Sequence, residues 1–273
     1  MKFDLHVHTV KSKDSALTPD GLYSAAKREG LAGVAVTDHN IFLEYPQLED
    51  LIIIPACEYS TDGGHLLVYF LKNPIEKELT QNEKGQYSWR EVIDAAHAQD
   101  AIVFIAHPFS PGIFRDIELW KALDGIEIYN ARAEHSRIKD ANFSAQTTCL
   151  TLDKPFSAGS DAHFAGEVGR AYWECGDFDI KDLNRSQVLG IIREKLMAGD
   201  GVVYAGTASP YYKVLSRYLS AIAARSPVKL LRAGALFVYT AFISIMRFIG
   251  FLPGLKAGYL EDWKSIDSIK NKE

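Results

Sequence analysis

Short apolar runs alternate with longer amphipathic stretches along most of this chain, and this alternation restricts its fold more than any other feature. A short run of apolar and β-branched residues indicates a buried strand, and an amphipathic stretch indicates a helix packed on it. Repeated units of this kind build α/β proteins with a mainly parallel sheet. The predicted strands span residues 3–7, 33–37, 52–56, 102–106, 125–129 and 156–159. With 273 residues, 47% of them hydrophobic, the chain is large enough for one α/β barrel.

Turn and capping residues predict how some of these strands are connected. The turn residues 62–64, Asp-Gly-Gly, predict a hairpin that adds an antiparallel strand at 66–71. Thr18, followed by a proline, is expected to cap a helix that Gly30 ends. Further N-cap candidates are Ser88, for a helix to residue 98, and Asn184 or Ser186, for a helix to residue 197.

The last quarter of the chain has a different character. We expect a barrel domain at 1–205 and a helical C-terminal extension at 206–273, packed on the barrel or at an oligomer interface. Residues 233–246 carry no charge, but a bilayer span needs about 20 apolar residues. Reaching that length includes Arg247, so a true span is the least favoured reading. A peripheral membrane contact through 228–252 stays open, with basic residues at the headgroups, namely Arg225, Lys229 and Arg232.

Charge and cysteine usage exclude some classes of protein. The formal net charge of -5 gives no general attraction to nucleic acid, so long nucleic acid is not an expected partner. The three cysteines have no CxxC spacing, which argues against a disulfide framework. The N-terminal residues enter a predicted strand at once and contain no apolar signal region. We therefore expect a cytoplasmic protein.

Six of the eight histidines fall at or just beyond the end of a predicted strand, and most have a carboxylate nearby. The set is His6, His8, His39, His65, His107 and His163, with Asp38, Glu58 and Asp161. In parallel barrels the C-terminal ends of the strands gather the catalytic groups, so these side chains should converge in space. His6 and His8 lie two residues apart on one strand and therefore point the same way.

So many buried imidazoles and carboxylates would be costly without a cation to neutralise them. Histidine and carboxylate ligands without cysteine suit Zn²⁺, Mn²⁺ or Fe²⁺, and up to nine donors indicate two or three ions. Glu58 is the best candidate for a bridging carboxylate. His97, inside a helical pattern, is expected to be a surface or core residue, and His135 is expected to line the pocket mouth. Cys57 is interpreted as a small buried residue rather than a nucleophile.

The same residues resemble the PHP (polymerase and histidinol phosphatase) superfamily. The matching segments, in family order, are Asp4-Leu5-His6-Val7-His8-Thr9, Ser12-Lys13-Asp14-Ser15, Thr37-Asp38-His39-Asn40, Cys57-Glu58, His65, Ala106-His107-Pro108 and Gly159-Ser160-Asp161-Ala162-His163. The resemblance implies a distorted (β/α)7 TIM-like barrel that hydrolyses phosphate esters with two or three metal ions. It implies three ligand sets: His6, His8, Glu58 and Asp161; then Glu58, His65 and His107; then Asp14, His39 and His163. The loop before Asp14 is one residue longer than in the commonest family pattern.

The leading hypothesis is therefore hydrolysis of a phosphate ester by a metal-activated water. Asp38 is expected to orient an imidazole or, alternatively, to handle a proton. Candidate phosphate or substrate contacts are Asn130, Arg132 and Arg170, then Lys13 and Arg115. The expected substrate is a small phosphorylated metabolite, a nucleotide or a short oligonucleotide end.

Three alternatives stay open at this stage. The protein could be a histidinol-phosphatase, a narrower version of the same chemistry. The same metal site could attack an amide or a lactone, because metal-activated water also attacks carbonyls. Outside the enzymes, the chain could be a metal-dependent regulatory or membrane-docking module in which residues 206–273 are the functional part.

Overall fold

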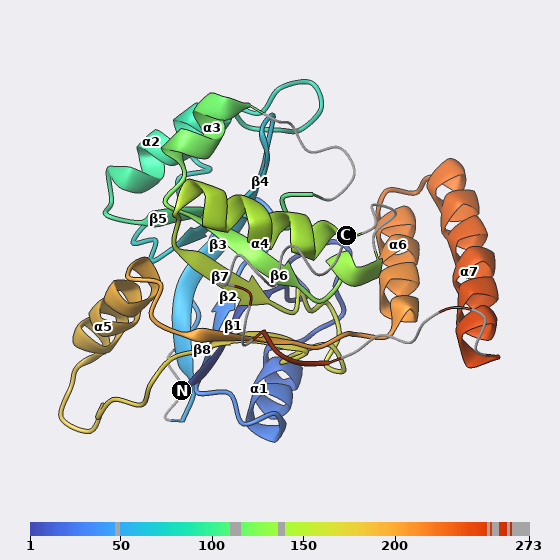
Figure 1. The fold of residues 1–273 in the computed structure, drawn as a ribbon. Coiled ribbons are helices and arrows are strands. Elements are labelled where there is room, and N and C mark those ends of the chain that lie inside the picture. The colour runs from blue at the N-terminus through green and yellow to red at the C-terminus, as the bar shows by residue number, and fades with distance from the viewer. Residues whose placement is uncertain are drawn as a thin grey trace.

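Eight strands close into a barrel in the computed structural model, which describes residues 1–46, 50–109, 116–135, 140–249, 252, 257–260 and 263 (Figure 1). Neighbours in the sheet follow chain order from β1 to β8, and β1 pairs with β8 to close the ring. The barrel strands are β1 (Lys2–Val7), β2 (Gly33–Val36), β3 (Ile52–Thr61), β4 (Gly64–Tyr69), β5 (Ile102–Ile105), β6 (Gly125–Asn130), β7 (Phe156–Gly159) and β8 (Ala171–Glu174). Two further strands, β9 (Val202–Ala205) and β10 (Gly258–Tyr259), extend the sheet from β8.

The sheet is mixed, and most of the strands that carry the site run parallel to one another. The pairs β1–β2, β2–β3, β5–β6 and β6–β7 are parallel, whereas β4 and β8 run antiparallel to both of their barrel neighbours. The predicted α/β barrel, its six strands and the hairpin before 66–71 are thus confirmed. The pattern also departs from a regular (β/α)7 repeat, because β3 and β4 are joined directly by a hairpin.

Helices cover the outside of the barrel (Figure 1). They are α1 (Pro19–Arg28), α2 (Trp89–His97), α3 (Ile117–Ala122), α4 (Ala141–Leu152) and α5 (Arg185–Met197), with a 3-10 turn, η1, at Ala133–His135. The Thr18 side chain caps α1 by accepting from the Gly21 N–H, and Gly30 follows with φ of 67°, as predicted. Asn184 forms a capping box with Gln187 at the start of α5.

The prediction for α2 needs a correction. Ser88 occupies the N-cap position, but its side chain makes no capping hydrogen bond. The Asp62 carboxylate accepts from the Trp89 N–H instead, at 2.9 Å. A residue from the β3–β4 turn therefore caps this helix, and local sequence could not reveal it.

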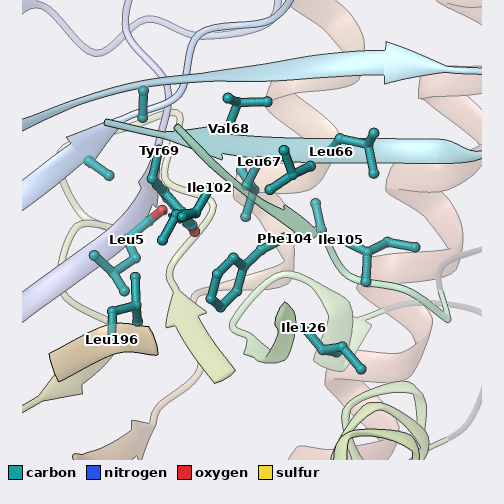
Figure 2. Packing of buried hydrophobic residues seen from close by; sticks show 14 of the residues in the cluster. Leu5, Leu66, Leu67, Val68, Tyr69, Ile102, Phe104, Ile105, Ile126 and Leu196 are labelled. Atoms are coloured by element: carbon teal, nitrogen blue, oxygen red, sulfur yellow. Dashed lines mark hydrogen bonds between the residues drawn. The ribbon is translucent and has the colours of Figure 1, made fainter. Parts of the chain in front are cut away.

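Two clusters of buried apolar residues fill the barrel and the layer between the strands and the helices. Figure 2 shows part of one cluster, with Leu5 of β1, Tyr69 of β4, Phe104 of β5 and Leu196 of α5 among the labelled side chains. The buried Tyr69 hydroxyl donates to the Leu5 carbonyl at 3.0 Å, which satisfies its polar end inside the core. This core fixes the strand ends that carry the polar site.

The C-terminal region forms a helical hairpin beside the barrel (Figure 1). Helix α6 (Pro210–Ala223) and helix α7 (Pro227–Phe248) pack along each other and are joined by three residues. In Figure 1, α6 lies between the barrel and α7. By length and composition, α7 is one helix in the described part of the chain that could cross a membrane.

Candidate metal centre

The histidines and carboxylates singled out above converge at one end of the barrel. His6 lies in β1, Glu58 in β3 and His65 in β4. The others follow strands: His8 after β1, His39 after β2, His107 after β5, and Asp161 and His163 after β7. Four overlapping groups have all their ligand atoms within 4.8 Å of one another: His8, His39 and His163; His6, His8 and Glu58; His6, His107 and Asp161; and His39, Glu58 and His65.

Backbone geometry at the strand ends directs these side chains inward. His107 and Asp161 have φ angles of 31° and 56°, in the left-handed region that non-glycine residues seldom adopt. Such conformations persist where the surrounding structure fixes them, and they are common at functional sites. Gly159, just before this turn, passes so close to β1 that an added Cβ would lie 2.6 Å from the His6 nitrogen. A glycine at the end of β7 therefore lets β1 and β7 approach at the site.

Three histidines have one ring nitrogen held by a fixed partner. His6 Nδ1 lies 2.8 Å from Glu127 Oε1, and His163 Nδ1 lies 2.9 Å from the Asp161 carbonyl. His8 Nδ1 lies 3.2 Å from Ser12 Oγ, which itself donates to Asp38. Each partner accepts an Nδ1–H and so leaves the Nε2 lone pair free to bind a metal.

The Nε2 atoms that remain face one another. His6 Nε2 and His8 Nε2 are 3.1 Å apart, and both lie within 4 Å of Asp161 Oδ1 and Glu58 Oε2. Two imidazole lone pairs at this distance repel unless a cation or a proton lies between them. The donor set therefore fits a divalent metal.

Glu58 is the centre of the cluster. Its side chain is fully buried, and its two oxygens lie 2.8 to 3.6 Å from ring nitrogens of five histidines: His6, His8, His39, His65 and His107. His39 Nδ1 and Glu58 Oε2 are 2.8 Å apart, but their orientation does not form a hydrogen bond. This position is the one that a bridging carboxylate would occupy.

Asp14 joins the cluster from the loop after β1. Its carboxylate oxygens lie 3.4 Å from His163 Nε2 and 3.7 Å from His39 Nε2. The one-residue longer loop therefore still brings Asp14 to the two histidines with which the resemblance groups it.

Buried polar atoms without hydrogen-bond partners provide a second test of the fit to a metal. Asp14 Oδ1, His39 Nδ1, Glu58 Oε2 and His107 Nδ1 are buried and have no such partner among the described residues. Buried polar atoms are nearly always satisfied in native proteins. Four exceptions within one cluster of metal-ligand residues indicate that these residues fit a bound cation.

The pKa values of the cluster residues are set by their burial and by the charges of the neighbouring side chains. Burial lowers the pKa of His6, but Glu127, Asp161 and Glu58 outweigh it and raise the pKa well above its usual value. The pKa of His39 rises to about 10 in the same way, because Glu58 and Asp14 outweigh burial. Burial alone would raise the pKa of Glu58, yet the neighbouring histidines hold it well below its usual range. Burial and then Arg132 lower the pKa of His163 to about 4, so this imidazole is neutral at pH 7.

The cluster has a closed floor and an open rim. The side chains of His6, His8 and Glu58 are inaccessible, whereas those of His39 and His65 are 26% and 38% exposed. A metal site of catalytic type keeps one side open for water and substrate. The rim residues are the ones that a substrate would meet.

Asp38 lies behind the cluster and makes four hydrogen bonds. It accepts from the Thr9 N–H and hydroxyl, from Ser12 Oγ at 2.7 Å, and from Tyr45 at 2.9 Å. Its lone pairs are thus engaged in holding the loop after β1. This geometry favours the orienting role that was one of the two predictions for Asp38.

Sequence reasoning missed two carboxylates that support the site. Glu127 of β6 holds His6 Nδ1 and also accepts from the His107 N–H at 2.6 Å. Glu167 accepts from the His163 N–H at 2.9 Å. A charged residue between two isoleucines of a buried strand was the available signal for Glu127. Glu167 lies in a loop without any such pattern.

The predicted substrate contacts lie in different surroundings. The Arg132 guanidinium is buried and makes two hydrogen bonds to Glu167, at 2.7 and 2.8 Å, and one to Ser216 of α6. Asn130 is buried, and its side-chain amide donates to Glu127 and, at 3.4 Å, to Asp161. Both arrangements favour structural roles. Lys13 and Arg170 are exposed, and Arg115 lies outside the described residues.

Two other side chains lie away from the metal chemistry. His97 is a partly exposed residue that bonds to Asp124 at 2.8 Å, apart from the cluster. The Cys57 thiol is fully buried, and burial raises its pKa well above the usual value, so it stays protonated. His135 belongs to η1, and its side chain lies outside the described structure.

The fold and the site together define a barrel protein with a cluster of histidines and carboxylates that fits divalent metal ions. A family model described as PHP-associated matches residues 139–194. Two uncharacterized proteins of Methanocaldococcus jannaschii are related in sequence. MJ0417 is 28% identical over 207 residues, covering 71% of this chain and 80% of that protein. MJ1587 is 30% identical over 149 residues, covering 48% of this chain and 82% of that protein.

Solved structures share the fold at low sequence identity. A two-domain protein from Bacteroides vulgatus, which contains a predicted PHP-like metal-dependent phosphoesterase, aligns with a TM-score of 0.54 at 19% identity. That alignment covers 76% of this chain and 65% of the other, so this chain spans about two thirds of the two-domain protein. PsfC from Pseudomonas syringae aligns with a TM-score of 0.57 at 18% identity over 81% of this chain and 98% of PsfC. The chain therefore contains a segment that matches the PHP-associated family model, and it shares the barrel fold of these solved structures.

Proposed function

We propose that this chain is a metal-dependent phosphoesterase that hydrolyses a small phosphorylated metabolite, a nucleotide or a short oligonucleotide end. The observation that carries the proposal is the convergence of His6, His8 and the other predicted ligands around Glu58. The Bacteroides vulgatus structure with the same fold contains a domain described as a predicted metal-dependent phosphoesterase, which supports this class of reaction.

The residues that would hold the metals are the six histidines with Asp14, Glu58 and Asp161. Two or three bound divalent ions, of zinc, manganese or iron, would supply Lewis acidity and lower the pKa of a bound water. The two Glu58 oxygens lie near ring nitrogens of His39, His65 and His107, so this one carboxylate could contact more than one bound ion. Glu127, Ser12 and the Asp161 carbonyl fix the tautomers of three imidazoles.

The substrate would enter at the open rim. His39 and His65 are the accessible ligands there. Lys13, next to Asp14, and Arg170 are exposed basic side chains that could contact phosphoryl oxygens. Arg132 acts through Glu167, which it pairs with, and thereby supports the loop of His163.

The test is a screen of phosphorylated metabolites, dinucleotides and an aryl phosphate with full-length protein reconstituted with Mn²⁺, Zn²⁺ or Fe²⁺. We expect turnover of at least one phosphate ester that requires metal and disappears in the His6→Ala/His8→Ala variant. Turnover that survives in this variant, or metal-replete protein inert on every phosphate ester, would contradict the proposal.

The competing hypothesis is an amide or lactone hydrolase. Substitution of exposed basic residues distinguishes it from a phosphoesterase, because only a phosphate substrate needs cationic contacts. Lys13→Ala/Arg170→Ala should raise KM for a phosphate ester if these residues contact the phosphate. Arg132→Ala is a poor test, because it would leave Glu167 buried without its partner. Full activity on amides or lactones together with none on phosphate esters would favour the competing reading.

A further inference from the structure

On helix α7 the large apolar side chains face outward, which is the opposite of their usual place on a surface helix of a soluble protein. The residues that face α6 include the buried Ala233 and Thr240, at 1% and 7% exposure. Large apolar side chains face outward instead, including Val238 at 68% and Phe242 at 57% exposure. A surface helix normally buries its apolar stripe and exposes its polar one. The exposed face of α7 is therefore an interaction surface.

This apolar face is continuous along the helix. The exposed large apolar residues of α7 and its C-cap are Val228, Leu230, Leu231, Phe237, Val238, Tyr239, Phe242, Ile245, Phe248 and Ile249. Most recur at spacings of three, four or seven residues and so fall on one side of the helix. In the described part of the chain α7 packs mainly along α6, and Figure 1 shows its other side turned away from the barrel.

Charge around the hairpin indicates which partner covers the face. Residues 201–260 contain seven lysines and arginines and no aspartate or glutamate, although the whole chain has a formal net charge of -5. Three of these cations, Arg225, Lys229 and Arg232, are exposed around the α6–α7 turn. An apolar face flanked by basic residues is the composition of helices that bind anionic lipid surfaces.

A second copy of the chain fits this charge pattern poorly. A two-fold interface brings the same patch of both copies together. Hairpin would then meet hairpin, and the acid-free segment 201–260 offers no carboxylate to pair with the facing cations. Like charges brought together in this way oppose association.

The position of α6 favours a helix that lies in the membrane surface over one that crosses it. α6 is fixed to the barrel, because Arg132 donates to Ser216 Oγ at 2.9 Å and Tyr212 stacks on Phe164. α7 is long enough to span a bilayer, but it packs along α6. A spanning α7 would have to leave α6 or draw Lys213 and Arg217 of α6 into the hydrocarbon.

We propose that the outward apolar face of α7, with the basic residues of the α6–α7 turn, docks on the surface of an anionic lipid bilayer. α6 lies between this face and the loop of Phe164 and Glu167, next to the metal ligand His163. When the protein is docked in this way, α6 separates the histidine and carboxylate cluster from the lipid surface.

Vesicle sedimentation with the purified full chain tests the proposal. Wild-type protein should sediment with phosphatidylcholine vesicles that contain phosphatidylglycerol and stay in solution with phosphatidylcholine alone. Val238→Glu/Phe242→Glu should lower the partition coefficient about tenfold or more, because it places charge in the apolar contact. Arg225→Ala/Lys229→Ala/Arg232→Ala should lower it about a hundredfold at low salt, at roughly fivefold per basic residue.

The matched control is Ile117→Glu, which changes an apolar residue that is 68% exposed on α3, away from the hairpin. It should bind vesicles like the wild type. Circular dichroism and hydrolysis of an aryl phosphate should match the wild type in all of these variants, which separates this proposal from the proposed function.

Several results would overturn the proposal. They are wild-type protein that ignores anionic vesicles, face variants that bind as well as the wild type, or a control that loses binding equally. Protein that resists extraction by alkaline carbonate would show a spanning helix instead. Light scattering that finds a wild-type dimer and a monomeric Val238→Glu/Phe242→Glu would show that a second copy covers the face.

Discussion

The barrel and the α6–α7 hairpin depart from the usual distribution of side chains in opposite directions. The barrel buries carboxylates and imidazoles, with Glu58 fully enclosed. The hairpin instead exposes large apolar residues such as Val238. Each arrangement is stable only with a complement: a cation neutralises buried charge, and an apolar surface covers exposed apolar side chains. The comparison shows that the two regions need opposite kinds of partner: a cation for the buried polar cluster and an apolar surface for the exposed face of α7.

Removal of the central carboxylate, Glu58, should have the largest effect, and it should act on the buried cluster of the barrel. Glu58→Gln keeps the side-chain shape but removes the charge that five imidazoles surround. We expect loss of the bound metal and of all measurable hydrolysis, checked by elemental analysis and an aryl phosphate assay. Glu118→Gln, on the surface of α3, is the control. Full metal content in Glu58→Gln would show that the carboxylate is not a ligand.

A supporting carboxylate should have a smaller effect. Glu127→Gln weakens the partner of His6 Nδ1 and of the His107 N–H without removing a predicted ligand. We expect about 10- to 100-fold weaker metal binding, measured by competition with a chromogenic chelator. An unchanged dissociation constant would mean that Glu127 does not orient His6.

Metal binding should strengthen as the pH rises through neutrality. Without metal, His39 has a pKa of about 10 and His6 a raised pKa, so protons must leave when a cation binds. Each proton released makes the apparent affinity rise about tenfold per pH unit, measurable by calorimetry. Affinity independent of pH between about 6 and 8 would contradict this linkage.

The same pKa values predict how stability depends on pH. The raised pKa of His39 stabilises the metal-free fold below its ordinary pKa, and this contribution is lost as the pH rises towards 10. The lowered pKa of Glu58 stabilises the fold above its ordinary pKa, and this contribution is constant from neutral to alkaline pH and is lost only in acid. The difference in Tm between metal-loaded and metal-free protein should therefore widen from neutral to alkaline pH, in thermal unfolding scans. A narrowing difference would contradict the assignment.

The smallest expected effect belongs to the hairpin. Val238→Glu adds a charge to a side chain that makes few contacts, so the free energy of unfolding should change by no more than about 0.5 kcal/mol. Chemical denaturation in the absence of lipid measures this. A loss of several kcal/mol would show that Val238 is packed in solution and would remove the contrast between the two regions.

Some features of the fold could be read from the sequence and others could not. The six strands that end at the site were predicted because their apolar runs are local and bounded. Strand β8, Ala171–Glu174, was missed because a four-residue run has little periodicity and its partners, β1 and β7, are distant in sequence. Helix α4 was missed because Ser and Thr interrupt its apolar pattern.

The sequence by itself determined the candidate donors of the cluster and the apolar character of α7, because residue type and short-range spacing are properties of the chain alone. Tertiary structure decided which imidazole nitrogen faces the centre, that Arg132 pairs with Glu167, and that the apolar stripe of α7 points outward. These outcomes depend on contacts between residues far apart in the chain. Packing fixes such contacts, and local sequence does not encode them.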